Sequence, residues 1–269
     1  MEQFYMEEQG GLKTVKCRAF EEISWLRHGF STRHGGVSQG ECASLSFSYQ
    51  KEKKEIVDEN FRRFCKANKL PFESLVLTHQ THTANVAMVN KNYQNRGRDR
   101  TLRETDGVVT ATKDLGLVCF TADCVPLLLV DPRAKVIAAV HAGWRGTVQS
   151  IAANAVETMV SAGATPQNIL AAIGPSIGPC CFEVGQEVAA EFAARFGKEF
   201  PLKEHRPGHS MVDLWRANRQ VLLEAGLQND RIFTAKLCTF CNNSDFYSHR
   251  YTNGRRGSLI AAISMEVEQ

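Results

Sequence analysis

Two apolar segments on either side of a short turn, within residues 121–146, constrain this chain more than any other stretch. They flank the turn Asp131-Pro132-Arg133-Ala134 and read CVPLLLV and KVIAAVHA. A hairpin centred on this turn pairs Leu128 with Ile137. The same register places Cys124 opposite His141, and directly opposed residues share one face of a sheet, with Cβ atoms about 4.5–5.5 Å apart. The sequence therefore predicts a thiol and an imidazole that meet at the end of a two-stranded ribbon.

Segments with helical spacing and segments with strand character alternate loosely along the rest of the chain. Apolar side chains recur every three or four positions in residues 51–68, 148–162, 185–196 and 213–225, which predicts four helices. Thr147 is expected to cap the second of them and Gly163 to end it. Because no repeat, low-complexity segment or linker separates these elements, we expect one compact α/β domain built in several layers.

The bulk composition excludes some classes of function. The chain has 269 residues and a net charge of only +3, which is too small to predict nucleic-acid binding. Its densest basic run, residues 91–103, is interpreted as a solvated loop rather than a phosphate-facing one. No apolar run approaches the roughly 20 residues needed to cross a membrane. Nine cysteines, an odd number, and an acidic start without an export segment favour reduced thiols and a cytoplasmic location.

A third ligand near Cys124 and His141 would make a catalytic metal site. Thiolate and imidazole suit Zn²⁺ and also copper, and three protein ligands with an open fourth position are typical of catalytic zinc. His79 and His82, in a polar interruption between two apolar stretches, are both candidates for the third ligand. Blue copper is less favoured because no methionine lies near these residues in the sequence.

The same pair permits two other interpretations. His141 could hold Cys124 as a thiolate nucleophile, with Asp123 or a third residue orienting the imidazole. The pair could also be structural, a buried cysteine beside a hydrogen-bonded histidine. Three arginines, Arg33, Arg145 and Arg250, lie in the loops expected around it, and a guanidinium group suits phosphate and other oxyanions. Trp144 or Phe182 could stack on a base, although core packing explains each equally well.

The remaining cysteine motifs do not predict a metal site. Cys180 and Cys181 are adjacent and are interpreted as small packing groups. Cys238 and Cys241 form the only C-x-x-C in the chain, so a four-cysteine zinc site cannot be assembled from repeated motifs. Asn242 and the polar residues after it favour a loop over the helix of a redox dithiol.

Several ordered segments resemble the laccase-domain family, also called multicopper polyphenol oxidoreductases and described as purine nucleoside phosphorylase-like. They are TADCVP at 121–126, HAGWRG at 141–146, IGPSIGPCCFEV at 173–184, STRHGGVS at 31–38, TDG at 105–107 and FYSHR at 246–250. The resemblance implies a single-domain α/β/β/α sandwich with mixed sheets over residues 1–269. It also implies a zinc ion held by His82, Cys124 and His141, with copper less favoured. His82 falls on a Gln-x-His-Gly pattern that begins at Gln80 and departs from the family at Thr83, which leaves His79 as the competing ligand.

The resemblance also implies an activity. Family members act on purine nucleosides, by phosphorolysis of adenosine, inosine, guanosine and methylthioadenosine and by deamination of adenosine. We therefore expect a zinc-dependent purine nucleoside phosphorylase with adenosine deaminase and methylthioadenosine phosphorylase activity, whose partners are nucleosides and phosphate. The residues expected to act in catalysis are Cys124, His141 and His82, and those expected to bind substrate are Arg33, Arg145, Gln80, His79 and Arg250. The alternative is an amidase acting on peptidoglycan precursors through Cys124 or zinc; a polyphenol oxidase is less favoured because it needs several coppers.

Overall fold

A six-stranded sheet containing both chain-terminal strands forms one half of the molecule. The computed structural model describes residues 2–93, 102–197, 200 and 203–266. Neighbouring strands of this sheet are antiparallel, except that its last strand pairs in parallel with β9. Their spatial order is β1 (Phe4–Gln9), β2 (Leu12–Cys17), β3 (Leu26–Ser31), β17 (Leu259–Met265), β9 (Gly116–Thr121) and β4 (Leu75–Val76).

A second six-stranded sheet carries the apolar hairpin at its centre. Both strands of that hairpin are buried along their whole length, as expected for strands covered on two faces. The sheet is mixed, because its two edge strands pair in parallel with their neighbours. The spatial order is β16 (Ile232–Thr234), β12 (Leu170–Ile173), β10 (Val125–Asp131), β11 (Val136–Ala142), β8 (Gly107–Thr110) and β6 (Val86–Met88).

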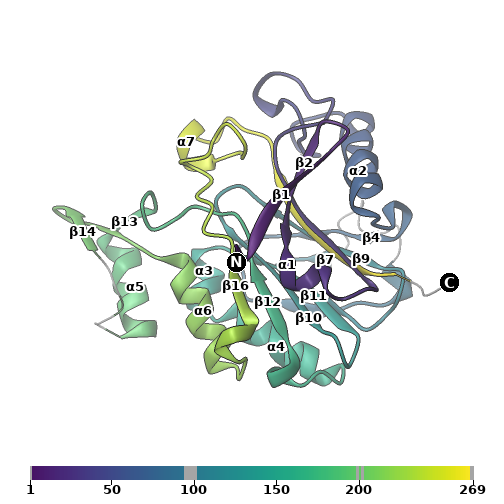
Figure 1. Cartoon of the computed structure of the whole chain (residues 1–269). Helices are drawn as coiled ribbons and strands as arrows, with labels where there is room; N and C mark the ends of the chain where they lie inside the picture. The colour runs from purple at the N-terminus through teal and green to yellow at the C-terminus, as the bar shows by residue number, and fades with distance from the viewer. Residues whose placement is uncertain (1, 94–101, 198–199, 201–202, 267–269) are drawn as a thin grey trace.

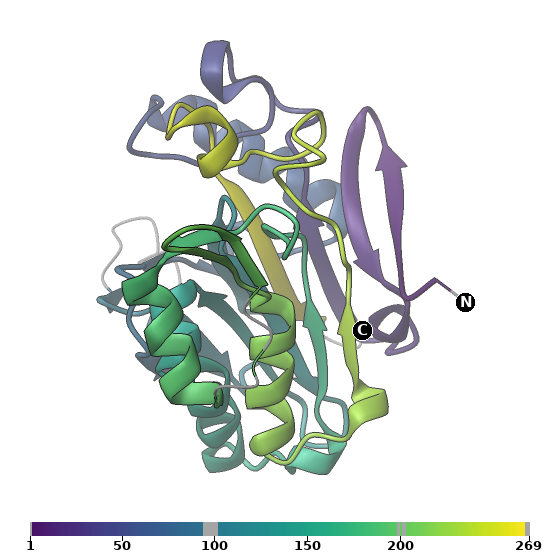
Figure 2. The same ribbon diagram turned by 90° about the vertical axis from the view of Figure 1, so that its left-hand side faces the viewer.

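The two sheets pack face to face, with helices on both outer faces. Alternate residues of β10 point to opposite sides, so Leu128 joins the core between the sheets and Leu127 joins the core beneath the helices. Helices α4 and α6 cover the second sheet, and α2 covers the first (Figures 1 and 2). The predicted α/β/β/α class with mixed sheets is therefore confirmed. The α-helices are α1 (Arg18–Glu21), α2 (Lys54–Asn68), α3 (Trp144–Val148), α4 (Ile151–Ser161), α5 (Gln186–Phe196), α6 (Leu214–Glu224) and α7 (His249–Thr252).

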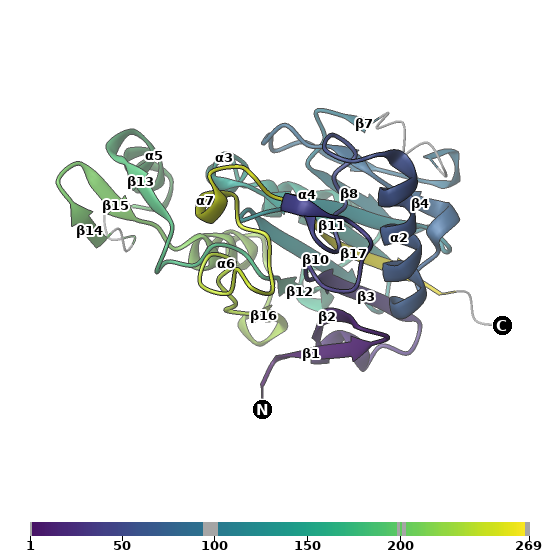
Figure 3. The same ribbon diagram turned by 90° about the horizontal axis from the view of Figure 1, so that it is seen from above.

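Two smaller sheets lie outside the two six-stranded sheets. A three-stranded sheet lies with α5 at one side of the molecule, opposite α2 (Figure 3). Two short strands, β5 and β7, pair in parallel near the polar loop that holds the candidate histidines. These elements are β13 (Glu183–Gly185), β15 (His209–Met211) and β14 (Lys203–Arg206), together with β5 (Thr78–His79) and β7 (Leu102–Arg103).

The predicted register of the central hairpin is wrong by two residues. His141 pairs with Pro126 rather than with Cys124, and Asp131 pairs with Val136. The turn therefore starts after Asp131, whose carboxylate accepts hydrogen bonds from the backbone N–H groups of Arg133 and Ala134, at 2.8 and 3.0 Å. Because a shift by an even number of residues keeps each side chain on its face, Cys124 and His141 still meet.

The helix expected at residues 148–162 is α4, which begins three residues later than expected, and a short helix that was not expected, α3, precedes it. Ser150 has a φ of 62°, in the left-handed region, and separates α3 from α4. Thr147 does not act as a cap, because it lies inside α3 and its hydroxyl accepts a hydrogen bond from Asn218 Nδ2 at 3.0 Å. Gly163 follows α4 with a φ of 98°, as predicted for a residue that ends a helix.

No helix within the described residues has the length and apolar character needed to span a bilayer. Most of the basic run at 91–103 cannot be placed against this fold, because residues 94–101 lie outside the described part of the chain.

Candidate active site

Three separate segments bring two imidazoles and a thiol together. His82 lies in the loop between β5 and β6, Cys124 directly precedes β10, and His141 is near the end of β11. Their ligand atoms all lie within 4.8 Å of one another. The Cys124 Sγ is 3.8 Å from His82 Nε2, and the two imidazole rings meet edge to face with centroids 5.0 Å apart. This cluster has the donor types and spacing of a three-ligand metal site.

Asp106 orients the imidazole of His141 and holds the backbone of His82 in place. It is fully buried just before β8, and its Oδ1 lies 2.7 Å from His141 Nδ1 and 3.0 Å from the backbone N of His82. Its Oδ2 accepts hydrogen bonds from the backbone N–H groups of Thr81 and Thr83 and from the Thr83 hydroxyl, at 3.1, 2.9 and 2.8 Å. Since His141 Nδ1 is occupied by this carboxylate, its Nε2 is left for the site. This carboxylate–histidine pairing is typical of metal ligands.

Left-handed backbone occurs at two positions of the cluster. His82 has a φ of 64° and Asp123 a φ of 90°, values that non-glycine residues rarely adopt. The surroundings hold Asp123 there: its carboxylate accepts from the Thr239 hydroxyl at 2.6 Å and from the Arg250 backbone N–H at 2.7 Å. Such strain persists only where several contacts enforce it, and it is common at functional sites.

Gly143 lies against His82 and Cys124, where a larger residue would not fit. A Cβ at this position would lie 2.8 Å from His82 Cδ2 and 3.4 Å from Cys124 Sγ. Gly143 has an ordinary φ of −67°, so the requirement for glycine comes from this close approach and not from the backbone conformation.

The electrostatics of the cluster favour a thiolate. Burial raises the pKa of the Cys124 thiol, but hydrogen bonds and charge from His141 and His82 outweigh it and lower the pKa to about 6. Burial lowers the pKa of His141, but Cys124 and Asp106 raise it to about 9. Burial likewise raises the pKa of Asp106, yet its hydrogen bond with His141 and the Thr83 donors bring it down to about 2. Without a metal, Cys124 and His141 therefore form a thiolate–imidazolium pair near pH 7.

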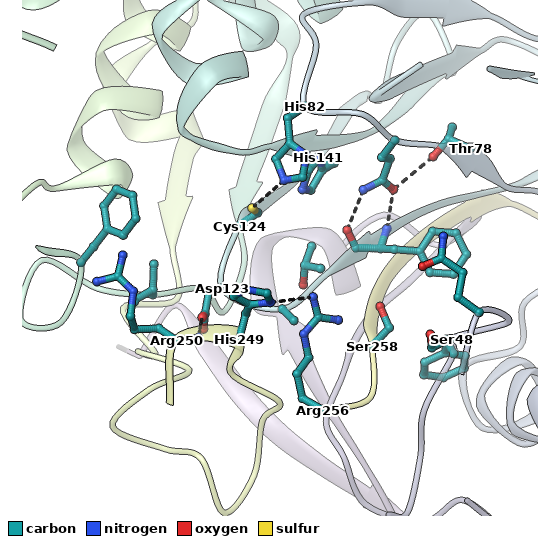
Figure 4. Close-up of a pocket in the computed structure, with 18 residues that line it drawn as sticks. Ser48, Thr78, His82, Asp123, Cys124, His141, His249, Arg250, Arg256 and Ser258 are labelled. Atoms are coloured by element: carbon teal, nitrogen blue, oxygen red, sulfur yellow. Dashed lines mark hydrogen bonds between the residues drawn. The ribbon is translucent and has the colours of Figure 1, made fainter. Parts of the chain in front are cut away.

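The cluster opens into a cavity of about 460 Å³, a size suited to a small molecule. Figure 4 shows His82, His141 and Cys124 on one side of it and Arg250, His249 and Arg256 on the other. The cavity is lined by Phe47, Ser48, Gln50, Thr78, Gln80, His82, Phe120, Thr121, Ala122, Asp123, Cys124, His141, Ile177, Phe182, His249, Arg250, Arg256 and Ser258. It thus combines a metal-type donor set, cationic groups and aromatic rings.

A family model described as multi-copper polyphenol oxidoreductase laccase matches residues 27–266. The chain belongs to this family. Purine nucleoside phosphorylase YlmD of Geobacillus stearothermophilus is 35% identical over 248 residues, covering 89% of this chain and 90% of the relative. Adenosine deaminase RL5, from an unknown prokaryotic organism, is 39% identical over 196 residues, covering 71% of this chain and 75% of the relative. The crystal structure of YlmD from Geobacillus stearothermophilus superposes with a TM-score of 0.92 at 33% identity, covering 99% of this chain and all of that one.

In this member of the laccase family, two of the five expected substrate-binding residues line the cavity. Arg250 does so, with its guanidinium carbon 5.5 Å from the centre of the Phe182 ring. Gln80 does so as well, but its amide binds both the N–H and the carbonyl of Phe120, at 2.7 and 2.8 Å. The side-chain amide of Gln80, which was expected to contact substrate, therefore holds Phe120 in place in the cavity wall.

The other three expected substrate-binding residues lie outside the cavity lining. Arg33 donates to the carbonyls of Ala43 and Asn243, so it ties loops together. Arg145 is exposed on α3, where its guanidinium packs 4.4 Å over the Trp144 ring. His79 is outside the donor cluster, and its Nδ1 is buried with no hydrogen-bond partner in the described part of the chain. None of these three side chains lines the cavity.

Two residues that the sequence analysis did not single out, Asp106 and Arg256, lie at the donor cluster and in the cavity wall. Asp123 was one candidate for orienting His141, but Asp106 occupies that place and the Asp123 carboxylate binds Thr239 and Arg250 instead. The TDG motif at 105–107 was the available signal for Asp106. Arg256 also lines the cavity, and no motif in the sequence indicated that it would.

Proposed function

We propose that this chain is a zinc-dependent purine nucleoside phosphorylase that also deaminates adenosine and phosphorolyses methylthioadenosine. The observation that carries the proposal is the placement of the His82–Cys124–His141 cluster across one cavity from Arg250 and Arg256. The names of the relatives, purine nucleoside phosphorylase and adenosine deaminase, agree with it. The substrates would be purine nucleosides and phosphate.

Zinc fits the donor chemistry of this cluster better than copper. A His₂Cys set with a carboxylate behind one imidazole is the ligand arrangement of a catalytic zinc site. A blue-copper site would add a distant methionine, and the cavity lining contains none among the described residues. Bound zinc would supply a Lewis acid that activates water for deamination. We assign His82, Cys124 and His141 as the zinc ligands. They are the proposed catalytic residues, because they would hold the ion at the place where the reaction occurs.

The cationic wall opposite the cluster is suited to phosphate. Arg256 lines the cavity, and its Nε has no hydrogen-bond partner among the described residues, so an anion would satisfy an unmet donor. Burial lowers the pKa of this guanidinium. Arg250 stands beside it on the same wall. In phosphorolysis a phosphate oxygen attacks C1′ of the ribose, the bond from C1′ to the base breaks, and the base takes the bonding electrons and a proton. We propose that the two arginines orient the phosphate and that Phe120 and Phe182 contact the purine.

One observation favours a second candidate, an amidase acting on peptidoglycan precursors. Cys124, His141 and Asp106 lie in line as a thiolate, an imidazole and a buried carboxylate, which is the arrangement of a cysteine nucleophile with its base. This candidate predicts release of an amino acid from a muramyl peptide. A polyphenol oxidase is less favoured, because a single three-donor cluster cannot hold several coppers.

We further propose that residues 1–269 form one family domain, that the enzyme works in the cytoplasm, and that it binds neither nucleic acid nor membranes. All nine cysteines are free, which is typical of a reducing compartment.

The test is a product analysis with adenosine, with and without phosphate. We expect adenine and ribose 1-phosphate only when phosphate is present, and inosine under both conditions. The Cys124→Ala variant should form none of these products. Absence of all three products from the zinc-loaded wild type, or full activity in Cys124→Ala, would refute the proposal, and amino-acid release from a muramyl peptide would favour the amidase.

A further inference from the structure

Four cysteines from two distant segments converge outside the candidate active site. Cys180 and Cys181 lie in the loop before β13, and Cys238 and Cys241 lie in the loop after β16. Their four sulfur atoms are all within 4.8 Å of one another. The Cys241 Sγ is 3.6 Å from that of Cys180 and 3.4 Å from that of Cys181. The expected role as a small packing group does not fit Cys180, which is exposed. The cluster draws on two different motifs, which the absence of a repeated C-x-x-C did not exclude.

The spacing of these sulfurs fits one tetrahedral metal ion. A disulfide requires an S–S distance of about 2.05 Å, and all four residues are free cysteines here. A zinc ion with Zn–S bonds of about 2.3 Å places its thiolates about 3.8 Å apart, close to the measured separations. An iron–sulfur cluster would put the four thiolates on different iron atoms and so spread them further.

The two loops are held in register by the backbone around the sulfurs. The Gly178 N–H donates to the Cys238 Sγ at 3.3 Å, a hydrogen bond that stabilises a thiolate. Ser176 bridges to Cys238 in parallel, through hydrogen bonds between Ser176 N and Leu237 O and between Thr239 N and Ser176 O. A Cβ on Gly178 would lie 2.8 Å from the Trp215 ring and 3.2 Å from Cys238 Cβ, so glycine permits this approach.

The partial exposure of the cluster gives an ion a route in. Cys238 is buried, Cys181 is half-buried, and Cys180 and Cys241 are exposed. A divalent ion bound by the four sulfurs would neutralise part of the negative charge that they carry as ligands. The arrangement is that of a closed structural site, with four protein ligands and no open position.

We propose that Cys180, Cys181, Cys238 and Cys241 bind a second, structural zinc ion. This ion would also stabilise one wall of the active-site cavity, because residues next to its ligands contact that wall. Thr239, between the two C-x-x-C cysteines, donates to Asp123, the neighbour of Cys124, and Phe182, next to Cys181, lines the cavity. The ion would join the two loops that form this wall.

The experiment measures metal content and thiol state in the full-length protein. Wild type is expected to carry about two zinc ions per chain, and both Cys241→Ser and Cys180→Ser about one. Cys124→Ser should also carry about one, because it would lose the other ion. Cys65→Ala, which removes a buried cysteine in α2 far from both clusters, is the matched control and should keep both ions.

Cobalt substitution of the wild type provides a second measurement that does not depend on how a variant folds. A tetrathiolate site gives much more intense sulfur-to-cobalt charge-transfer absorption than a site with one thiolate, so the wild type itself should show the stronger absorption. Three results would overturn the proposal: one zinc in wild type that Cys124→Ser removes, iron in place of zinc, or a Cys181–Cys241 disulfide found by thiol counting without reductant. Any of these would leave the proposed nucleoside chemistry intact, because that is tested by its own products.

Discussion

The Asp106 Oδ1 lies 2.7 Å from His141 Nδ1 and also accepts the backbone N–H of His82. One buried carboxylate therefore sets the direction of one imidazole and the position of the other. Asparagine at this position would turn one acceptor into a donor that faces N–H groups. We expect Asp106→Asn to weaken zinc binding about 10–100-fold. A competition titration with a chelator measures this. The control is Asp245→Asn, which alters a half-buried carboxylate that pairs with His34 outside the cluster. Wild-type affinity in Asp106→Asn would contradict the assigned role.

The two candidate histidines, His79 and His82, should behave differently. His82 is next to Cys124, while His79 lies on β5 outside the cluster. His82→Ala is expected to lose most of the active-site zinc, and His79→Ala to keep it. Metal analysis of both variants decides the assignment, and it would be reversed if His79→Ala were the variant that loses zinc.

A methyl group at position 143 should disturb the cluster without altering the backbone conformation. The added Cβ of Gly143→Ala would press on His82 and Cys124, at 2.8 and 3.4 Å. We expect weaker zinc binding and at least about a 10-fold fall in kcat/KM, since small displacements of ligands and reacting groups are costly. Gly185→Ala is the control, because its Cβ would meet only the flexible end of Glu187. Equal effects in the two variants would count against the steric explanation.

The protonation state of Cys124 gives a pH prediction for metal-free protein. Its pKa is lowered to about 6, so the thiolate persists at pH 7 and is lost as the pH falls below about 6. About nine-tenths of the thiol is then ionised at pH 7, against a few per cent for an ordinary cysteine. Iodoacetamide labelling of the Cys124 peptide from pH 4 to 10, in chelator-treated protein, should report this. The same peptide in urea should titrate above pH 8, and coincidence of the two curves would disprove the shift.

Removing Arg256 should separate the two proposed reactions. Phosphorolysis uses phosphate and deamination does not, so Arg256→Ala should raise the KM for phosphate at least about 10-fold while inosine formation changes little. The neighbouring exposed Arg255→Ala is the control. An equal loss of both reactions would show that Arg256 acts on the nucleoside or on the fold.

Local patterns in the sequence were sufficient for most elements and for the Cys124–His141 pair. The four longer helices, α2, α4, α5 and α6, follow from spacing alone. Cys124 and His141 were paired correctly despite the wrong register, because the error was an even number of residues. Thr147 looked like a cap, but a long-range hydrogen bond from Asn218 holds it inside a helix. Tertiary contacts of this kind override local preference.

The residues that the sequence could not place are those whose partners are remote along the chain. Asp106 has short motif support, but its contact with His141 depends on how β8 pairs with β11. The four-cysteine cluster joins two motifs that carry no shared spacing signal. The parallel bridge between Ser176 and Cys238 and the hydrogen bond from Gly178 to Cys238 bring them together. Arg33 and Arg145 were expected at the cavity, but each contacts a different group away from it. Arg33 donates to the Ala43 carbonyl, and Arg145 packs over the Trp144 ring.

The network around Asp106 also bears on the order of assembly. Five hydrogen bonds, from His141, His82, Thr81 and Thr83, fix the ligand-bearing loop to β8 through protein groups alone. The folded polypeptide therefore sets the arrangement of the metal ligands before any ion binds. An ion can arrive last, and be exchanged, without the loop having to refold around it.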